Sequence, residues 1–360
     1  MTSEPREFCR ARIAALLAAL FICVAWNAYA APPLHGYSAD VSRITVSGLS
    51  SGGYMAVQLH VSHSATVKGA AIFAAGPYYC AGGHSWTAYY NCMTPGALAP
   101  LPALSKLHAV TEALAKEGRI DPTRHLADAR VWLFSGTHDE TVSPEVVNAL
   151  AGYYARYVDP KQLTFVRDRP AGHAVVSADA DVKAACGVTK RPFINRCTDE
   201  RSGSPYDAAG ALLAYLLGSA PSAPQAENGE IVAFDQRPFA GGSPHSISLS
   251  DVGYAYVPAV CRTERCRVHI AFHGCAQSEE SVGQAFIRDA GYNRWADVYR
   301  LIVLYPQTIS RNGWGGDLTF VMNPKGCWDW WGYTGADYHT KAGPQIRAVK
   351  AMVDRIGEAR

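Results

Sequence analysis

The stretch Ile44–His60, ITVSGLSSGGYMAVQLH, places a short glycine-rich turn between two different patterns. Residues 44–48 are apolar and rich in β-branched side chains, which is typical of a strand, whereas residues 52–63 favour a helix. Between them Gly48 and Gly52 flank Ser50 in a G-x-S-x-G motif, and glycine allows a sharp turn and close backbone approach. A serine on such a strand–turn–helix is a candidate nucleophile. Ser51 can offer its backbone N–H to an oxyanion, and Ser47 lies within the strand.

A serine hydroxyl is a weak nucleophile unless a histidine takes its proton and an acid orients that histidine. In α/β-hydrolases these residues follow in the order Ser, Asp, His, each on a loop after a strand. Asp139 follows the apolar segment 129–136, and His173 follows the segment 163–168. We therefore predict a triad of Ser50, Asp139 and His173.

Each partner of the serine has a competitor. An aspartate after a strand is often a turn former or helix cap, and this role is open to Asp139 and to Ser143. Asp168 is a rival acid, although it lies at a strand end before an Arg-Pro turn. His138 is a rival base that adjoins Asp139.

Several apolar segments are typical of buried strands, and helical patterns lie between them. The strand segments are residues 44–48, 67–76, 129–136, 163–168, 266–274 and 301–307, and the clearest helical patterns are 144–157, 206–217 and 344–356. Apolar strands that alternate with helices favour an α/β fold with a mostly parallel central sheet flanked by helices. We expect residues 31–360 to form a single catalytic domain.

The order of the motifs is unusual for an α/β-hydrolase. The loop of the oxyanion hole ordinarily precedes the nucleophile and often begins His-Gly, but here His273-Gly274 lies far downstream. Read as a circle, the last helix leads through residues 36–43 into the strand before Ser50, which restores the ordinary order. We therefore expect a circularly permuted α/β-hydrolase fold in which the Pro-, Ser- and Ala-rich residues 218–229 join the ancestral termini.

The N-terminal residues have the features of an export signal. Three arginines among the first twelve residues precede the apolar stretch 13–25, which is too short to span a bilayer comfortably, and Ala28-Tyr29-Ala30 is a cleavage pattern. We expect residues 1–30 to be a signal peptide and the protein to be secreted into the periplasm or the medium. An uncleaved anchor is the alternative for this segment, and no later membrane anchor is expected.

The eight cysteines that follow the signal are expected to form disulfides, because an exported protein meets an oxidising compartment. Zinc is the alternative, but no C-x2-C or H-x3-5-H pair lies near them. Short loops favour Cys80–Cys92, Cys186–Cys197 and Cys261–Cys266, which leaves Cys275–Cys327.

The formal net charge is +2 at pH 7, and no basic run occurs, so nucleic acid is not expected as a partner. Together these motifs resemble the single-domain, circularly permuted poly(3-hydroxybutyrate) depolymerases of the α/β-hydrolase superfamily. The segments that carry the resemblance are GLSSGGYMAVQLHVSHS (48–64), FAAGPYYC (73–80), GTHDETVSP (136–144), Gly172-His173, FINRC (193–197), HGCAQS (273–278), GYNRWAD (291–297), VLYPQ (303–307) and NPKGCWDWWGY (323–333). The loops around 80–92 and 312–323 depart from the family pattern.

The resemblance implies Ser50 as nucleophile, Asp139 and His173 as its partners, and an oxyanion hole made by the backbone N–H groups of Ser51 and Cys275. It implies a polyester or oligoester substrate and a monomeric enzyme without metal or organic cofactor. A Cys275–Cys327 disulfide would bring Trp328, Trp330 and Trp331 near the site, where aromatic side chains suit an uncharged polyester. We expect at least one of these tryptophans in the core and one at the site.

Two other functions share these motifs. A secreted carboxylesterase for small or aromatic esters, such as feruloyl or acetyl esters, would use the same triad. A non-catalytic polymer-binding protein with an inactive hydrolase fold is the alternative outside enzymes, although the presence of Ser50, Asp139, His173 and the HGC loop favours an enzyme.

Overall fold

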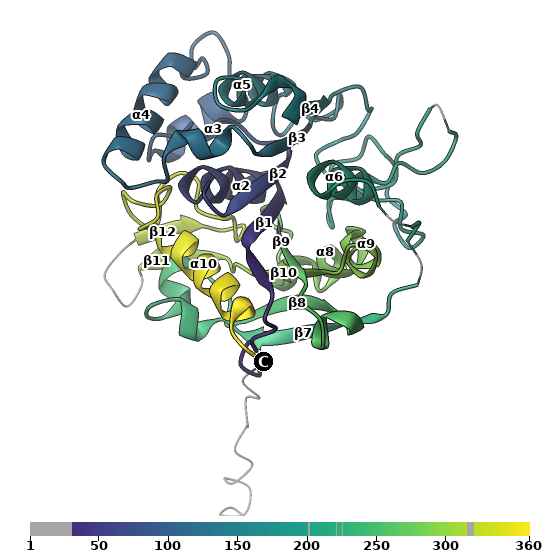
Figure 1. Ribbon diagram of the computed structural model, residues 1–360. Coiled ribbons are helices and arrows are strands. Elements are labelled where there is room, and N and C mark those ends of the chain that lie inside the picture. The colour runs from purple at the N-terminus through teal and green to yellow at the C-terminus, as the bar shows by residue number, and fades with distance from the viewer. Residues whose placement is uncertain (1–30, 201, 221, 225, 315–319) are drawn as a thin grey trace, which may run out of the picture. The chain divides into compact units, whose positions relative to one another are not determined.

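The computed structural model describes residues 31–200, 202–220, 222–224, 226–314 and 320–360 (Figure 1). The predicted signal peptide, residues 1–30, lies outside the described residues. Pro32–Arg360 forms one compact unit. No helix in the described ranges combines the length and the apolar character needed to cross a membrane.

An eight-stranded sheet in the order β4-β3-β2-β1-β9-β10-β8-β7 forms the centre of this unit (Figure 1). The six predicted strands are all present and run parallel to one another. The strands of the sheet are β1 (Asp40–Leu49), β2 (Val67–Phe73), β3 (Arg130–Phe134), β4 (Leu163–Val166), β7 (Gly229–Asp235), β8 (Val252–Pro258), β9 (Arg267–Phe272) and β10 (Leu301–Tyr305). The prediction of an α/β fold with a mostly parallel sheet is confirmed.

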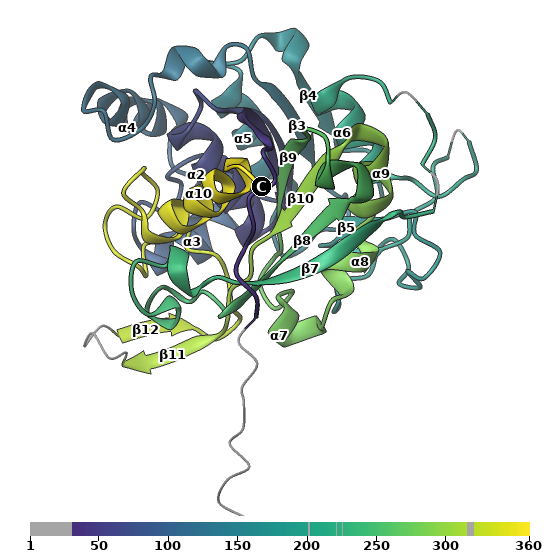
Figure 2. The same ribbon diagram turned by 60° about the horizontal axis from the view of Figure 1, so that its bottom comes forward.

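Helices cover both faces of the sheet because apolar side chains alternate along its strands. On β3, Val131 and Leu133 belong to one buried cluster, whereas Trp132 and Phe134 belong to another. The first cluster includes side chains of α2 (Ser51–Ser62), α4 (Leu104–Lys116), α5 (Pro144–Tyr154) and α10 (Pro344–Gly357), and the second includes those of α6 (Ala208–Leu217), α8 (Ala285–Asp289) and α9 (Tyr292–Tyr299). Figure 2 shows α2 and α10 on one side of the sheet and α6 and α9 on the other.

The strand order brings the two halves of the chain together at β1, which pairs with β2 on one side and β9 on the other. The C-terminal end of α10 lies beside the segment that leads into β1. There the N–H of Tyr37 donates to the carbonyl of Ile356 at 2.9 Å, and the N–H of Ser38 donates to the carbonyl of Glu358 at 2.8 Å. Residues 218–229 connect α6 to β7 of the same sheet. This arrangement agrees with the permuted order expected from the motifs.

Other elements were not predicted. β7 and β8 form an antiparallel pair at one edge of the sheet. α3 (Ser85–Cys92) follows β2, and the antiparallel strands β11 (Arg311–Trp314) and β12 (Phe320–Asn323) follow β10 (Figure 2). Other short elements include β5 (Val175–Val176), β6 (Ile194–Asn195) and α7 (Glu279–Val282).

We predict that the buried His60 makes the fold sensitive to acid. His60 lies in α2 with its Nδ1 2.9 Å from the hydroxyl of Tyr154, and burial lowers its pKa to about 3. In the unfolded chain His60 binds a proton as the pH falls through about 6.5, whereas in the folded chain it stays neutral. The free energy of unfolding therefore decreases as the pH drops from about 6.5 towards the folded pKa. At pH 5 this costs about 2 kcal/mol for one histidine.

Urea unfolding at pH 7 and pH 5 measures this effect. His60→Gln keeps a polar partner for Tyr154 but does not titrate, so its loss of stability between the two pH values should be about 2 kcal/mol smaller than that of the wild type. His35→Gln, at an exposed position, is the matched control and should follow the wild type. An equal pH dependence in all three proteins would contradict the prediction.

Candidate active site

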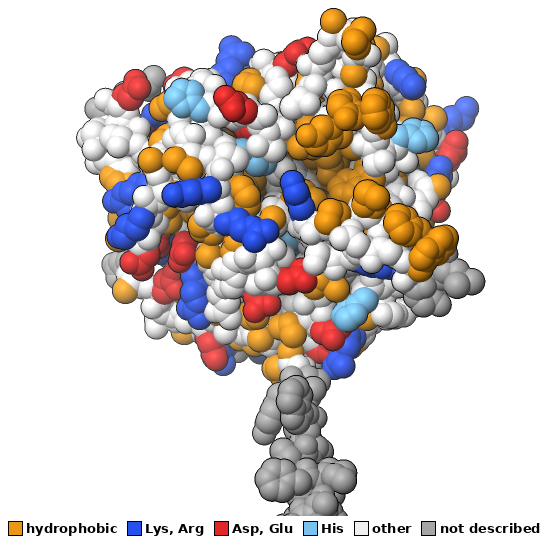
Figure 3. Space-filling model, turned by 180° about the vertical axis from the view of Figure 1, so that it is seen from behind, with side chains coloured by type: hydrophobic (Ala, Val, Ile, Leu, Met, Phe, Trp, Pro, Cys, Tyr) orange, Lys and Arg blue, Asp and Glu red, His pale blue; other side chains and the backbone are white. Residues whose placement is uncertain are grey.

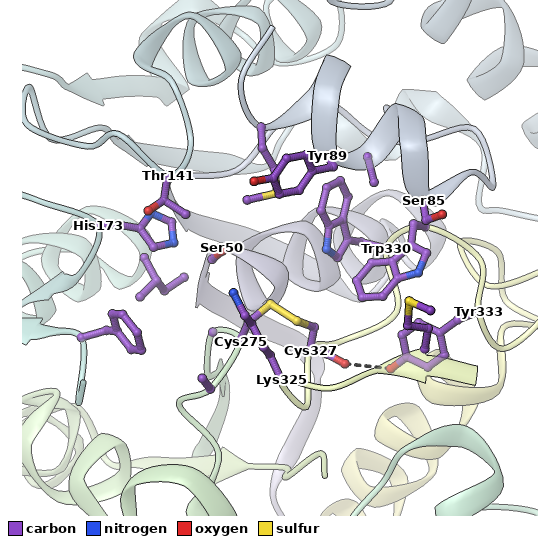
Figure 4. A pocket seen from close by; sticks show the side chains of 18 of the residues that line it. Ser50, Ser85, Tyr89, Thr141, His173, Cys275, Lys325, Cys327, Trp330 and Tyr333 are labelled. Atoms are coloured by element: carbon purple, nitrogen blue, oxygen red, sulfur yellow. Dashed lines mark hydrogen bonds between the residues drawn. A yellow bond between two sulfur atoms is a disulfide. The ribbon is translucent and has the colours of Figure 1, made fainter. Parts of the chain in front are cut away.

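Ser50 lies on the sharp turn between the end of β1 and the start of α2 (Figure 4). Its backbone has φ 57° and ψ −122°, a strained conformation for a residue with a side chain. The turn is held because the Ser50 N–H donates to the carbonyl of Phe73 at 3.0 Å and its carbonyl accepts from Tyr54 at 2.9 Å. The predicted strand–turn–helix context of Ser50 is present.

Close backbone packing explains the two glycines of the motif. A Cβ atom on Gly48 would lie 2.2 Å from the carbonyl oxygen of Gly52, and one on Gly52 would lie 2.3 Å from the carbonyl oxygen of His273. The turn around Ser50 therefore presses against the end of β9, from which the His273–Gln277 loop departs.

Substitution of Gly52 is expected to disturb both the fold and the site. A methyl group on Gly52→Ala must displace backbone rather than a flexible side chain, and overpacking of this kind costs about 1–3 kcal/mol. We expect a lower Tm and a large loss of esterase activity. Gly242→Ala is the matched control, since nothing lies within 4 Å of its added Cβ, and it should leave both properties unchanged. Equal Tm values for the two variants would contradict this explanation.

Asp139 and His173 meet on the loops that follow β3 and β4. Asp139 Oδ2 lies 2.8 Å from His173 Nδ1. The other carboxylate oxygen accepts the N–H groups of Thr141 and Val142, both at 2.9 Å, which fixes the carboxylate. The backbone N–H of His173 donates to Thr189 Oγ1 at 2.9 Å. Both side chains are buried, and Asp139 orients the imidazole while it also shapes its own turn.

The competing residues lie elsewhere. The Asp168 carboxylate is largely exposed and lies 3.5 Å from Arg169 Nε. His138 is exposed. Ser143 is the N-cap of α5 and accepts the N–H of Glu145, so the helix-cap role belongs to Ser143.

Ser50 and His173 line the same end of a cavity of about 910 Å³ (Figure 4). In the described part of the chain no hydrogen bond links Ser50 Oγ to the imidazole, whose Nδ1 is bonded to Asp139. Such contacts are often long before a substrate binds. The cavity has the size typical of a site for an elongated organic ligand.

The His273–Gln277 loop closes the cavity beside Ser50 and is fixed by side-chain hydrogen bonds. His273 Nδ1 lies 2.8 Å from the carbonyl oxygen of Gly274, and His273 Nε2 lies 3.2 Å from the backbone nitrogen of Thr308. Burial lowers the pKa of His273 to about 4, so the ring is neutral at pH 7. A neutral ring that accepts the N–H of Thr308 at Nε2 donates from Nδ1 to Gly274.

This contact orients the next peptide group. In a trans peptide the C=O and N–H groups point in opposite directions. The Gly274 carbonyl faces His273, so the Cys275 N–H points away from that ring, and Cys275 lines the cavity. The Ser51 N–H is the first of α2 and has no carbonyl one turn earlier to bond.

The eight described cysteines form four disulfides, which are the three pairs that the short loops favour and the pair that those three leave. They are Cys80–Cys92, Cys186–Cys197, Cys261–Cys266 and Cys275–Cys327. The last of these links the Cys275 loop to the tryptophan-rich segment that follows Cys327, and both cysteines line the cavity.

Two of the three predicted tryptophans, Trp330 and Trp331, line the cavity. Trp330 stacks on Tyr54 with ring centroids 4.0 Å apart. Trp328, the third candidate for substrate contact, does not line the cavity, because its ring is fully buried against Phe272. The structure thus has a tryptophan of this segment in the core, as expected. Trp330 is also buried in the core cluster, so of the two buried tryptophans of this segment only Trp330 borders the cavity, and Trp331 is half-buried.

A buried carboxylate holds this turn in place. Asp329 accepts the backbone N–H groups of residues 331–334 and the Thr334 hydroxyl at 2.6–3.2 Å. Burial raises the pKa of Asp329, and the hydrogen bonds from Thr334, Gly332 and Tyr333 oppose that rise. The shape of the tryptophan wall therefore depends on one internal side chain.

The sequence assigned no role to the rest of the cavity wall, although some of these residues lie within the segments that carry the family resemblance. They include Ser85, Tyr89, Met93, Thr141, Thr189, Arg191, Phe193, Phe320, Met322, Lys325 and Tyr333. Large apolar side chains at Trp86, Tyr89, Phe320 and Met322 are exposed. Figure 3 shows hydrophobic side chains gathered around a hollow on this face.

No family model matches the chain. The chain is 40% identical over 351 residues to a poly(3-hydroxybutyrate) depolymerase of Delftia acidovorans. The aligned region covers 96% of this chain and 66% of the relative, so the chain spans just under two thirds of the relative's length. It is 32% identical over 336 residues to a polyhydroxybutyrate depolymerase of Talaromyces funiculosus, with 91% of this chain and 93% of the relative covered.

Two solved structures are similar, each with a TM-score of 0.78, 30% identity and coverage of 90% of this chain and 98% of the other. One is a PHB depolymerase from Penicillium funiculosum, and the other is a PHB depolymerase complexed with R3HB trimer. These similarities extend over nearly the whole of the compact unit that carries the Ser50 turn, the Asp139–His173 pair and the Cys275 loop. The chain therefore belongs to the family of poly(3-hydroxybutyrate) depolymerases, which are carboxylic ester hydrolases.

Proposed function

We propose that this chain is a secreted, monomeric serine esterase that hydrolyses the ester bonds of poly(3-hydroxybutyrate) or its oligomers. The observation that carries the proposal is the 2.8 Å contact between Asp139 and His173 at the end of a cavity that Ser50 also lines. The relatives named as depolymerases and the similar structure complexed with R3HB trimer support the choice of substrate.

The proposed reaction is a two-step acyl transfer. His173 Nε2 accepts the proton of Ser50 as its Oγ attacks the ester carbonyl, and Asp139 stabilises the imidazolium that forms. The imidazolium then protonates the leaving alkoxide, which departs as the hydroxyl end of one fragment. Water, deprotonated by His173, attacks the acyl-enzyme; the imidazolium then returns the proton to Ser50 Oγ as the carboxylic acid end of the other fragment is released.

The oxyanion of each tetrahedral intermediate is proposed to bind the backbone N–H groups of Ser51 and Cys275. The Ser51 N–H stands at the start of α2 with no hydrogen bond to another described residue, and the Cys275 N–H belongs to the peptide that His273 orients. Donors that are already in place need no reorganisation during the reaction, which is why they stabilise a developing charge effectively.

The character of the cavity supports a polyester rather than a polar substrate. Polyester units carry methyl and ester groups but no charge, and the wall presents Tyr89, Phe193, Trp330 and Trp331. The exposed aromatic side chains beside the cavity offer an apolar surface to an insoluble polymer. Secretion is supported by the four disulfides and by the signal-like residues 1–30.

Incubation of the mature protein with amorphous poly(3-hydroxybutyrate) granules and with methyl-esterified 3-hydroxybutyrate trimer tests the proposal, with products identified by mass. We expect soluble hydroxy acids from at least one of these substrates. Hydrolysis of p-nitrophenyl or feruloyl esters alone would identify a general carboxylesterase instead. A fluorophosphonate should label Ser50, and the label should be lost in His173→Ala; a wild type that is neither labelled nor active would indicate a non-catalytic polymer-binding protein.

A further inference from the structure

Two cations line the cavity, and no acid accompanies them. Arg191 and Lys325 are both cavity residues, and among the described residues of its wall there is no aspartate or glutamate. Both side chains are exposed, and neither forms an ion pair with a described residue. The wall of a site for an uncharged polyester thus carries two positive charges without a partner.

Each of the two residues lies in a segment that is bonded to a loop of the proposed catalytic site. Lys325 accepts the N–H of Ala276 through its backbone carbonyl at 2.6 Å, two residues before the Cys327 disulfide. Figure 4 shows its side chain beside Cys275, with the nitrogen turned towards the end of the cavity that holds Ser50. Arg191 lies two residues after Thr189, which accepts the backbone N–H of His173.

Arg191 also borders a second, smaller pocket of about 310 Å³, whose lining includes Lys183 and Lys190 as well as Asp181 and Asp289. The two acids belong to that neighbouring pocket and not to the wall around Ser50. The lining of the smaller pocket therefore combines its three cations with two acids, whereas the wall around Ser50 has two cations and no acid among its described residues.

We propose that Arg191 and Lys325 form a subsite for a carboxylate, the free acid end of an oligoester; this rests on the proposed function. A poly(hydroxy acid) is neutral along its length, but one terminus is a hydroxyl and the other is a carboxylate. A pair of cations in an otherwise apolar site distinguishes those ends. The fragment that leaves with the new hydroxyl is the one that ends in the carboxylate, so the subsite favours cleavage near the acid terminus.

The matched pair of ligands is the 3-hydroxybutyrate trimer as free acid and as its methyl ester, which differ in this charge and in one methyl group. Calorimetric binding to the inactive Ser50→Ala protein measures recognition without catalysis. Exposed ion pairs change binding by at most about fivefold each. We therefore expect Arg191→Gln combined with Lys325→Gln to raise the Kd of the free acid about tenfold and to leave the Kd of the methyl ester unchanged.

Lys106→Gln removes an exposed cation of α4 that does not line the cavity, and it should change neither Kd. A rise in salt concentration should weaken only the free acid, because salt screens exposed charges. The proposal is overturned if the double variant changes both Kd values equally or neither, or if neither trimer binds. Hydrolysis of the methyl ester by the wild type is a separate result that tests the proposed function itself.

Discussion

Asp139→Asn is expected to lower kcat for ester hydrolysis by about 10⁴ and to leave the fold intact. The remaining side-chain oxygen still accepts the N–H groups of Thr141 and Val142, so the turn after β3 keeps its hydrogen bonds. The amide nitrogen, however, replaces the oxygen that lies 2.8 Å from His173 Nδ1. It donates to Nδ1, which moves the imidazole proton to Nε2, and Nε2 can then no longer accept the proton of Ser50.

The measurement is kcat and KM for a soluble oligoester, together with Tm for each protein. Glu140→Gln is the matched control because it removes a carboxylate from an exposed position on the same loop, and its kcat should equal that of the wild type. The KM of Asp139→Asn should change little, since Asp139 does not line the cavity. An Asp139→Asn protein of wild-type activity would remove Asp139 from the mechanism.

The sequence predicted the parallel core because each of its strands carries its own signal. Residues 131–134 are apolar throughout since β3 is covered on both faces, and Trp132 and Phe134 pack on one face while Val131 and Leu133 pack on the other. The turn at Ser50 could also be predicted from a short segment, because close backbone packing requires the two glycines that lie within five residues of sequence. Asp139 and His173 were found since each follows such a strand.

Other features depend on contacts that no local pattern records. The strands β7 and β8 pair in antiparallel fashion, unlike the six predicted strands, and the place of β8 between β7 and β10 is settled by neighbours far along the chain. Trp328 and Trp330 are two residues apart, chemically identical and both buried, yet only the turn held by Asp329 decides that Trp330 also lines the cavity. Arg191 and Lys325 were not identified because exposed cations are ordinary until a fold places them on one wall.

The role of His273 is to aim a peptide group rather than to exchange a proton. Its Nδ1 holds the Gly274 carbonyl at 2.8 Å, and the amide of Gln277 braces the same loop by accepting the Gly274 N–H at 2.7 Å. Gln277 is in turn bonded through its nitrogen to the carbonyls of Pro192 and Phe193 at 2.9 and 3.1 Å. If the His273 contact is lost, the Gly274–Cys275 peptide is free to rotate and the proposed Cys275 donor leaves its position.

Two substitutions separate this role from simple packing, since each keeps one of the two ring contacts. The amide nitrogen of His273→Asn occupies the place of Nδ1 and still donates to Gly274, whereas the longer His273→Gln reaches the place of Nε2 and serves Thr308 instead. Loss of an oxyanion donor typically costs about 10²–10³ in rate. We therefore expect kcat to fall by about 10² in His273→Gln, with KM little changed, and to stay within about tenfold of the wild type in His273→Asn. Similar Tm values would show that both variants are folded, and equal kcat values for the two would mean that the orientation of the Cys275 peptide does not depend on His273.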